Sequence, residues 1–359
     1  MMYKIGEVFT LIRNGANIKQ GEDDTGYPIT RIETISNRVV DRNKMGYAGI
    51  HEIGRYSDYI LEDGDILMSH INSETHLGKV ALYEEIPGET IIHGMNLLCL
   101  RPNRSILNCR YAFYSLMSDG FLRQIPRIMK KSVNQASFTV TALKELQIHV
   151  PPMEQQLQIV SVMDRIQSLL LQRQKQAAVI DQLVKSRFIE LFGDPETNPK
   201  GWTRQRLDQI CENLDSRRVP ITSTNRKAGN YPYYGASGIV DYVKDYIFDE
   251  DILLISEDGA NLVMRSTPIA FSVSGKVWVN NHAHVVRFES KATQKYIEIC
   301  FALTDISGSI TGTAQPKLNQ AKLNAMMFCV PPIELQEQFA TFVEQTDKSK
   351  LCGKMEVAA

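Results

Sequence analysis

The stretch VPPMEQQLQIV at residues 150–160 recurs as VPPIELQEQFA at residues 330–340. Proline fixes φ and lacks an N–H donor, so a double proline stops a helix from extending back through it but is tolerated at a helix start. A glutamine-rich run with spaced apolar residues follows each pair, which predicts a helix beginning at both places. Pro331 follows Pro151 by 180 residues, half of the 359-residue chain, so we predict an internal repeat.

The repeat extends beyond these two stretches. At the same offset, about twenty residues align without gaps, including Gln135 with Gln315, Phe138 with Leu318, Leu143 with Leu323, Val150 with Val330, and Gln156 with Gln336. Further upstream, YILEDGDIL at 59–67 resembles YIFDEDIL at 246–253 after a small shift. The sequence therefore predicts two similar globular units, each followed by a helix.

The composition is that of a globular protein, with 43% hydrophobic and 23% charged residues, and the length suggests about two domains. A net charge of -1 excludes a uniformly basic surface, so any nucleic-acid contact would use local patches. We find no apolar run of about 18 residues and no secretory leader, and therefore expect a cytoplasmic protein without a membrane span. The six cysteines lie far apart without a CxxC pair, which predicts reduced thiols.

Each globular unit has the pattern of an α+β fold. Short apolar or alternating runs, such as DILLISED at 251–258 and HAHVVRF at 282–288, are separated by Gly, Asn, Asp and Pro, which indicates strands and turns. One helix is predicted in each unit, over residues 109–123 and 292–305.

The segment between the units differs in kind. Residues 153–192 contain neither Gly nor Pro and end at Gly193-Asp194-Pro195, a typical helix stop, so one long helix is predicted. At 1.5 Å per residue it would be a rod of about 60 Å. Its apolar residues are spaced by three and four, as in a coiled coil: Ile159, Met163, Ile166, Leu170, Ala177, Ile180, Val184, Phe188 and Leu191.

The helix predicted after Pro332 is the expected partner of this rod, because Phe339, Phe342 and Val343 give it an apolar face. Antiparallel packing of the two helices would place the units at opposite ends, related by an approximate two-fold axis. Such a shape suits a DNA target in two parts, because half-sites on one face of the duplex lie about 34–36 Å apart.

The combined pattern resembles the specificity subunits of type I restriction-modification systems. The resemblance covers essentially the whole chain and rests on Q-x-x-[LF]-x(4)-L, on V-P-P-[MI]-E-x-Q, on KSRFIELFGDP at 185–195 and on GWTRQRLDQIC at 201–211. It implies two target-recognition domains, at 1–150 and 196–330, a central long helix at 151–195 and a distal helix at 331–359. That distal helix is shorter by about twenty residues than is usual in the family, and a second KSRF-like ending is missing.

The resemblance also implies the function and the partners. Each recognition domain would read one half of a split, asymmetric target in double-stranded DNA. The helices would set the spacer and bind two methyltransferase subunits, and restriction subunits would join that core. Two other interpretations stay open: an archived or truncated specificity protein kept for domain shuffling, and a detached recognition region of a fused restriction-methylation enzyme.

Catalytic motifs are missing from the sequence. The double prolines follow Val, so no N/D-P-P-Y/F loop is present for a methyltransferase, and there is no G-x(4)-G-K-[ST] phosphate loop, HExxH or GxSxG. We expect a non-catalytic subunit without a cofactor, with S-adenosylmethionine, ATP and Mg bound by the partners only. Glu257 with Asp258, or His282 and His284 with His93, are weak candidates for a metal site beside the interpretation as turn or packing residues.

DNA binding needs cations for phosphates, and Asn, Gln, Arg or Lys on loops for base edges. The strongest candidates lie ahead of the first double proline: Arg123, Arg127, Lys130, Lys131 and Asn134. Asn72 and Asn261 lie in corresponding loops and could read adenine, although turns also favour asparagine. The remaining candidates are Arg13, Asn14, Lys19, Lys79, Arg217, Arg218, Arg226, Lys227, Arg265 and Lys317.

The helix starts provide a second kind of candidate site. Gln156 and Gln336 lie in the first turn of their helices, where they could satisfy free backbone groups and hold each helix against its own unit. We expect methyltransferase docking further along the rod. The junction and docking candidates are Gln135, Gln156, Ile166, Leu170, Ile180, Val184, Phe188, Gln315 and Gln336.

Overall fold

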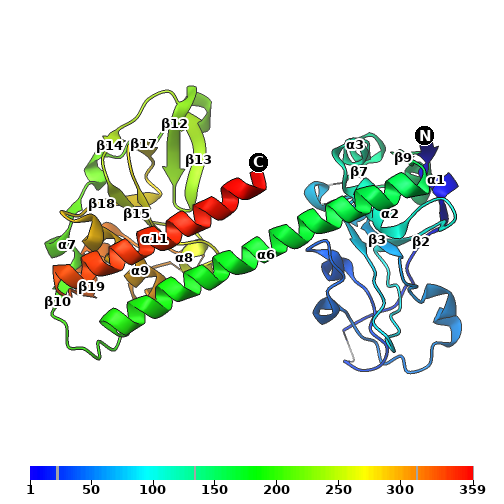
Figure 1. The fold of residues 1–359 in the computed structure, drawn as a ribbon, viewed down its shortest axis with the longest axis horizontal. Helices are drawn as coiled ribbons and strands as arrows, with labels where there is room; N and C mark the ends of the chain where they lie inside the picture. The colour runs from blue at the N-terminus through cyan, green and yellow to red at the C-terminus, as the bar shows by residue number, and fades with distance from the viewer. Residues whose placement is uncertain (22–23, 133–134, 313, 359) are drawn as a thin grey trace. The chain divides into compact units, whose positions relative to one another are not determined.

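The computed structural model describes residues 1–21, 24–132, 135–312 and 314–358, and side chains as far as residue 349. The chain divides into two compact units, Met1–Leu170 and Leu171–Ala359, and the division falls inside the long helix α6 (Met153–Phe192) (Figure 1). The α+β prediction for both units is confirmed. In the described part of the chain, no helix has the length and apolarity that crossing a membrane requires.

Unit 1 is built on a four-stranded antiparallel sheet in the order β2-β6-β3-β5. Every residue of β3 is buried, because the sheet is covered on both faces. The strands are β1 (Met2–Lys4), β2 (Phe9–Asn14), β3 (Ile66–Ser69), β4 (Ile71–Asn72), β5 (Val80–Leu82), β6 (Leu97–Pro102), β7 (Lys130–Lys131), β8 (Ala136–Ser137) and β9 (Gln147–His149).

Besides α6, the helices of unit 1 are α1 (Ile5–Val8), α2 (Cys109–Met117), α3 (Asp119–Leu122), α4 (Ile125–Ile128) and α5 (Val140–Lys144). The helix predicted over 109–123 is interrupted at Ser118. That residue adopts an extended backbone, and its hydroxyl accepts a hydrogen bond from the N–H of Phe121, so it ends α2 and caps α3. Ser118 competes with the helix backbone in the manner typical of serine.

Unit 2 repeats this plan. Its main sheet has the order β11-β18-β15-β16, which corresponds strand by strand to β2-β6-β3-β5, and the pair β10-β19 corresponds to β1-β9. The strands are β10 (Arg204–Arg206), β11 (Glu212–Asn213), β12 (Ala228–Gly235), β13 (Gly238–Val243), β14 (Phe248–Asp249), β15 (Ile252–Ser256), β16 (Ala270–Val273), β17 (Lys276–Val279), β18 (Ala283–Arg287) and β19 (Met327–Cys329). Its helices are α7 (Leu207–Ile210), α8 (Asn261–Met264), α9 (Lys291–Leu303), α10 (Gln320–Ala325) and α11 (Ile333–Ala358).

One sheet has no counterpart among the named strands of unit 1. It has the order β13-β12-β17-β14 and is dominated by the hairpin of β12 and β13, which turns at Ala236 and Ser237. The sequence YPYYGASGIVDYV at 231–243 encodes it, with a small-residue turn between two aliphatic and aromatic runs. That signal was present in the sequence, but the hairpin was not predicted there as a separate feature.

The predicted long helix is confirmed over residues 153–192. It ends because Gly193 adopts a left-handed φ of 79°, and a Cβ there would lie 2.6 Å from the Pro199 ring. The indole Nε1 of Trp202 donates to the carbonyl of Phe192, and the Lys200 ammonium donates to the carbonyls of Glu190 and Leu191. These donors satisfy the carbonyls that the end of a helix leaves free.

Within unit 2, α11 packs antiparallel against the C-terminal half of α6 (Figure 1). Phe192 contacts Phe339, while Arg187, more than one turn earlier in α6, lies over the ring of Phe342. Phe188 completes an aromatic cluster with Phe192, Phe339 and Tyr296. The antiparallel pairing predicted from the repeat is therefore present at this end of α6.

Candidate nucleic-acid interface and helix junctions

A small three-stranded ladder brings the candidate DNA-binding loops together in unit 1. Asn72 and Lys131 both pair with Ala136, and Ile71 and Lys130 both pair with Ser137. The loop after β3 and the basic segment ahead of the first double proline, which are distant in sequence, therefore share one edge of the unit.

Unit 2 contains the same ladder at the equivalent residues. Lys317 bridges Asp258 on one side and Thr311 on the other. The position of Lys317 matches that of Ser137, because the N–H of Phe138 donates to the carbonyl of His70, and the N–H of Leu318 donates to that of Glu257. The two ladders have one topology and different side chains, as expected of related modules with different ligands.

The basic segment of unit 1 is exposed, but acids from elsewhere pair with part of it. The ammonium of Lys131 lies 2.8 Å from a carboxylate oxygen of Glu74, and Arg123 lies 3.9 Å from Asp119. Arg127 and Lys130 are also exposed. Asn134 lies outside the described residues. The exposed Gln135 accepts hydrogen bonds through its backbone carbonyl from Ser132.

The two asparagines predicted to read adenine use their amides within their own turns. Asn72 donates to the hydroxyl of Ser69 at 3.2 Å and accepts from the N–H of Ser73 at 2.8 Å. Asn261 donates to the carbonyl of Thr267 and accepts from the N–H of the same residue, both at 3.0 Å. Both asparagines therefore shape their loops, which is the alternative interpretation of a turn asparagine.

Three further cations of unit 1 lie near its loops. Arg13 stacks on the ring of Tyr59, with its guanidinium carbon 4.0 Å from the ring centroid, and donates to the carbonyl of Asp58. Lys79 donates to the carbonyl of Ser36 at 3.4 Å, so it spans from the end of one loop to another. Asn14, at the end of β2, and Lys19 are exposed.

The cations of unit 2 differ in how far they remain open to solvent. Lys227 and Lys317 are exposed, although Lys317 lies 3.1 Å from Glu257. Arg217 pairs with Glu250 at 2.7 Å and stacks on Phe248. Arg226 makes an equivalent pair of contacts, with Asp241 at 3.2 Å and with the ring of Tyr233.

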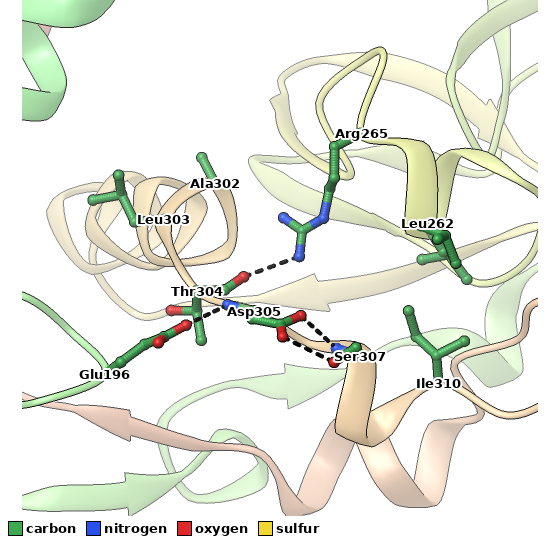
Figure 2. A pocket seen from close by; sticks show the side chains of 10 residues that line it. Glu196, Leu262, Arg265, Ala302, Leu303, Thr304, Asp305, Ser307 and Ile310 are labelled. Atoms are coloured by element: carbon green, nitrogen blue, oxygen red, sulfur yellow. Dashed lines mark hydrogen bonds between the residues drawn. The ribbon is translucent and has the colours of Figure 1, made fainter.

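Arg218 and Arg265 make their contacts inside unit 2. The guanidinium of Arg265 donates to the carbonyls of Phe301 and Thr304 and so caps the end of α9, as Figure 2 shows for Thr304. Burial lowers the pKa of Arg265. Arg218 is 13% exposed and donates to Glu257 at 2.6 Å and to the carbonyl of Ala283. We therefore leave both arginines out of the proposed DNA-binding surface.

Arg218 belongs to a buried ionic network centred on His284. The Nδ1 of His284 lies 2.6 Å from an Asp215 oxygen, and its Nε2 lies 2.8 Å from the carbonyl of Leu318. Both neighbours are acceptors, an arrangement that the doubly protonated ring satisfies. Burial alone would raise the pKa of Asp215, but the hydrogen bond and charge of His284, with the N–H of Val285 and the charge of Arg218, hold that pKa below its ordinary value.

The network gives Glu257 and His284 a structural role. Burial would also raise the pKa of Glu257, but Arg218, His284 and Lys317 keep it below its ordinary value. Among the residues that the structure describes, no group of three or more His, Cys, Asp or Glu side chains is arranged to hold a metal ion. The cysteines with described side chains, Cys99, Cys109, Cys211, Cys300 and Cys329, are free thiols.

Gln156 joins α6 to unit 1. The side chain is fully buried, and its Oε1 accepts from the N–H of Asn108 at 2.9 Å, at the start of α2. Its Nε2 donates to the carbonyls of Ile106 and Pro151. One side chain thus satisfies three backbone groups, one just before α6 and two just before α2.

Gln336 is also buried, and its Nε2 donates to the carbonyl of Pro331 at 2.7 Å. Its Oε1, however, is buried without a hydrogen-bond partner among the described residues. Gln315, the partner of Gln135 in the repeat, is exposed.

The structure separates the candidates on α6 into two groups. Val184 and Phe188 are buried in the core of unit 2, and Ile180 is half-buried. Ile166 and Leu170 are exposed by 44% and 48%. Val184 and Phe188 belong to the core that joins α6 to α9 and α11, whereas Ile166 and Leu170 lie outside that core.

Comparisons with known proteins support this pattern. The family model described as the type I restriction modification DNA specificity domain matches residues 1–180 and again residues 199–353. A protein of Methanocaldococcus jannaschii, assigned as the specificity subunit of the type I restriction enzyme MjaX, is 40% identical over 212 residues, which are 59% of this chain and 50% of that protein. The EcoKI specificity subunit of Escherichia coli is 22% identical over 160 residues, covering 44% of this chain and 34% of that one.

The chain thus spans half or less of the length of these two relatives in the alignments. The fold is also found in solved structures. The S subunit of a type I restriction-modification system from M. genitalium matches with a TM-score of 0.55 at 15% identity, covering 100% of this chain and 92% of that one. A chain from a study of complex assembly in the type I system matches with a TM-score of 0.52 at 15% identity, covering 100% and 93%.

Proposed function

The chain belongs to the type I restriction modification DNA specificity family, and on that premise we propose that it is the DNA-sequence specificity subunit of a type I complex. Each unit binds one half of a bipartite, asymmetric target. The helices dock two methyltransferase subunits, and restriction subunits join through that core. The chain carries no catalysis of its own, and S-adenosylmethionine, ATP and Mg are bound by the partner subunits.

The observation that carries this proposal is the double match to the family model together with the shared ladder. Both units present the loop after a buried central strand beside the segment ahead of a double proline. Asn72, Lys130 and Lys131 occupy this edge in unit 1, and Asp258 and Lys317 occupy it in unit 2. A common scaffold with different side chains supports the proposal that each unit binds a different half-site.

The DNA-binding surface that we propose consists of the cations of these edges together with exposed or half-buried cations and polar groups from other loops of each unit. Phosphate contacts fix a protein on the duplex, and loop side chains then reach base edges. In unit 1 we propose Arg13, Asn14, Lys19, Lys79, Arg123, Arg127, Lys130 and Lys131. In unit 2 we propose Arg217, Arg226, Lys227 and Lys317. Asn72 and Asn261, whose amides are bonded within their own turns, are left out.

Docking of the methyltransferase is supported by the apolar surface of α6. Val162, Ile166 and Leu170, spaced four residues apart and so on one face of this helix, are exposed by 44% to 58%. Large apolar side chains gathered in this way mark a surface that a partner covers. The buried residues Val184 and Phe188 are not part of that surface.

Co-expression with the cognate methyltransferase tests the proposal. We expect a purified complex of two methyltransferase subunits and one copy of this chain that methylates a split motif, identified by methylation-sensitive sequencing of the host genome. A complex without any methylated motif would contradict the proposed function. A one-to-one or inactive complex would instead favour an archived specificity protein.

A further inference from the structure

His282 lies at the edge of unit 2 that carries the ladder of Asp258, Lys317 and Thr311. Its Nδ1 lies 2.8 Å and 3.0 Å from the two carboxylate oxygens of Asp258. The His282 side chain is 51% exposed, whereas that of Asp258 is 19% exposed. A partly buried carboxylate therefore orients an imidazole that remains open to solvent.

The backbone of this residue is also held in place. The N–H of His282 donates to the side-chain oxygen of Asn280 at 2.8 Å, and the N–H of Asn280 donates to the carbonyl of Tyr234 in β12. The carbonyl of His282 accepts from the N–H of Glu257 at 2.9 Å. The buried hydroxyl of Ser256 in turn donates to the carbonyl of Ala236 at 2.5 Å, which ties the hairpin turn to the same edge.

The chemistry of this arrangement is specific. In the neutral ring, the Nδ1–H donates to Asp258, so Nε2 is an acceptor. Nε2 has no hydrogen-bond partner in the part of the chain that the structure describes, and it matches the exocyclic amino group that adenine or cytosine presents in the major groove. Lys317 pairs with Asp258 in the same ladder and is half exposed, with its ammonium 3.1 Å from Glu257.

The equivalent position in unit 1 carries a different polar side chain. Ala283 pairs with Ser256 in unit 2, and Leu97 pairs with Ser69 in unit 1, so His282 corresponds to Asn96. Asn96 adopts a left-handed φ of 76°, which asparagine tolerates better than most residues. The two units thus present different hydrogen-bonding groups from one place in the scaffold.

We propose that His282, oriented by Asp258, is a specificity-determining residue that contacts a base edge in the half-site bound by unit 2. This inference rests on the proposed function and extends it to a residue outside the loops singled out in the sequence. The sequence pattern indicates only a weak metal ligand or a packing residue at His282, because its pairing with Asp258 joins residues 24 positions apart.

Selection from a randomised DNA duplex pool tests the inference. The full chain, in complex with its methyltransferase subunits, is used to enrich bound duplexes, and the motifs selected by the wild type, H282A, D258N and H149A are compared by sequencing. We expect H282A to lose about ten- to a hundredfold of the preference at one base pair of one half-site, the range for a good base contact. D258N should weaken the preference at the same base pair, because a neutral amide holds the ring less firmly than the carboxylate does.

H149A is the matched control, since His149 is an exposed histidine on β9 of unit 1, and it should select the wild-type motif. The other half-site should be unchanged in every variant. If H282A selects the full wild-type motif, the inference is wrong while the proposed function stands. If H282A loses both half-sites, or melts well below the wild type, His282 has a structural role and the inference is also wrong. If the wild type itself selects no motif, the proposed function fails.

Discussion

Gln156 and Gln336 occupy the same place in the two halves of the repeat, yet only Gln156 has both ends of its amide satisfied. The Oε1 of Gln156 accepts from the N–H of Asn108, while the Oε1 of Gln336 has no partner among the described residues. A buried polar atom without a partner costs free energy that a paired atom does not. The two helix starts are alike in sequence, but they differ in how well the buried glutamine is hydrogen-bonded to its own unit.

The variant Q156A should destabilise the chain more than Q336A. Removing Gln156 leaves three backbone groups without their partner, one of them in a buried hydrogen bond and two in part-buried ones, and losing a buried partner costs about 1–3 kcal/mol. Removing Gln336 leaves one such group and also removes the unpaired Oε1. Denaturant unfolding measures both. If Q156A leaves both the unfolding curve and the co-purification of the methyltransferase unchanged, the junction role is wrong.

Phe188 and Ile166 should behave in opposite ways, although both belong to the apolar pattern of α6. Phe188 is fully buried against Phe192, Tyr296 and Phe339, so F188A should lower the free energy of unfolding by about 3–5 kcal/mol. Ile166 is 44% exposed, so I166A should change stability by less than about 0.5 kcal/mol. I166A should instead reduce the amount of methyltransferase that co-purifies with the chain. Equal effects of the two variants on stability would contradict this division.

Acid should destabilise unit 2 through the His284 network. Asp215 and Glu257 have pKa values held below their ordinary range, so the stability that they contribute is present above the ordinary carboxyl pKa of about 4 and is lost as the pH falls through the lowered values. Both tryptophans, Trp202 and Trp278, lie in unit 2, so their fluorescence follows this loss in denaturant titrations from pH 6 to pH 3.

The variant D215A checks the origin of that loss. It should cost about 1–3 kcal/mol at pH 7 for each of the two buried donors that it leaves without their acceptor, Nδ1 of His284 and the N–H of Val285, and the decline between pH 5 and 3 should become shallower. A decline as steep as that of the wild type would show that other carboxyl groups cause it.

Unit 1 should lose stability at higher pH than unit 2. Burial lowers the pKa of His70 and of His93 to about 4, whereas the unfolded chain protonates its histidines near pH 6.5. Between these values the unfolded state binds more protons, so stability falls as the pH drops from about 6.5 to 4, by up to about 3 kcal/mol per histidine. H70F should remove part of this dependence. The chain is first treated with denaturant at each test pH. A brief pulse of hydrogen exchange at one constant pH then measures how far the peptides of unit 1 are unfolded, separately from those of unit 2.

Features of the fold that depend on residues close together in the sequence could be predicted, whereas those that depend on distant residues could not. The bounds of α6 follow from the double proline, the Gly193 stop and the three-four spacing, which are all local features, and the structure has the same residues. The break at Ser118 was missed, because a serine within an apolar helix pattern becomes a cap only when the chain turns there. The exposed cations were found as charge patterns. The partners that remove Arg218 from the surface come from segments up to 65 residues away, so no local pattern indicates them.

The basic segment of unit 1 should contribute to DNA binding mainly through phosphates. Arg127 and Lys130 are exposed beside the ladder that carries Asn72, so R127A/K130A should weaken binding to every duplex sequence to a similar extent. Each phosphate contact that is lost should reduce the slope of the logarithm of the binding constant against the logarithm of salt concentration by about 0.9. Fluorescence anisotropy from 50 to 200 mM salt measures that slope for the complex with the methyltransferase. K144A, which removes an exposed cation from α5, is the control. If R127A/K130A has the same slope as K144A, the basic segment does not contact the DNA backbone.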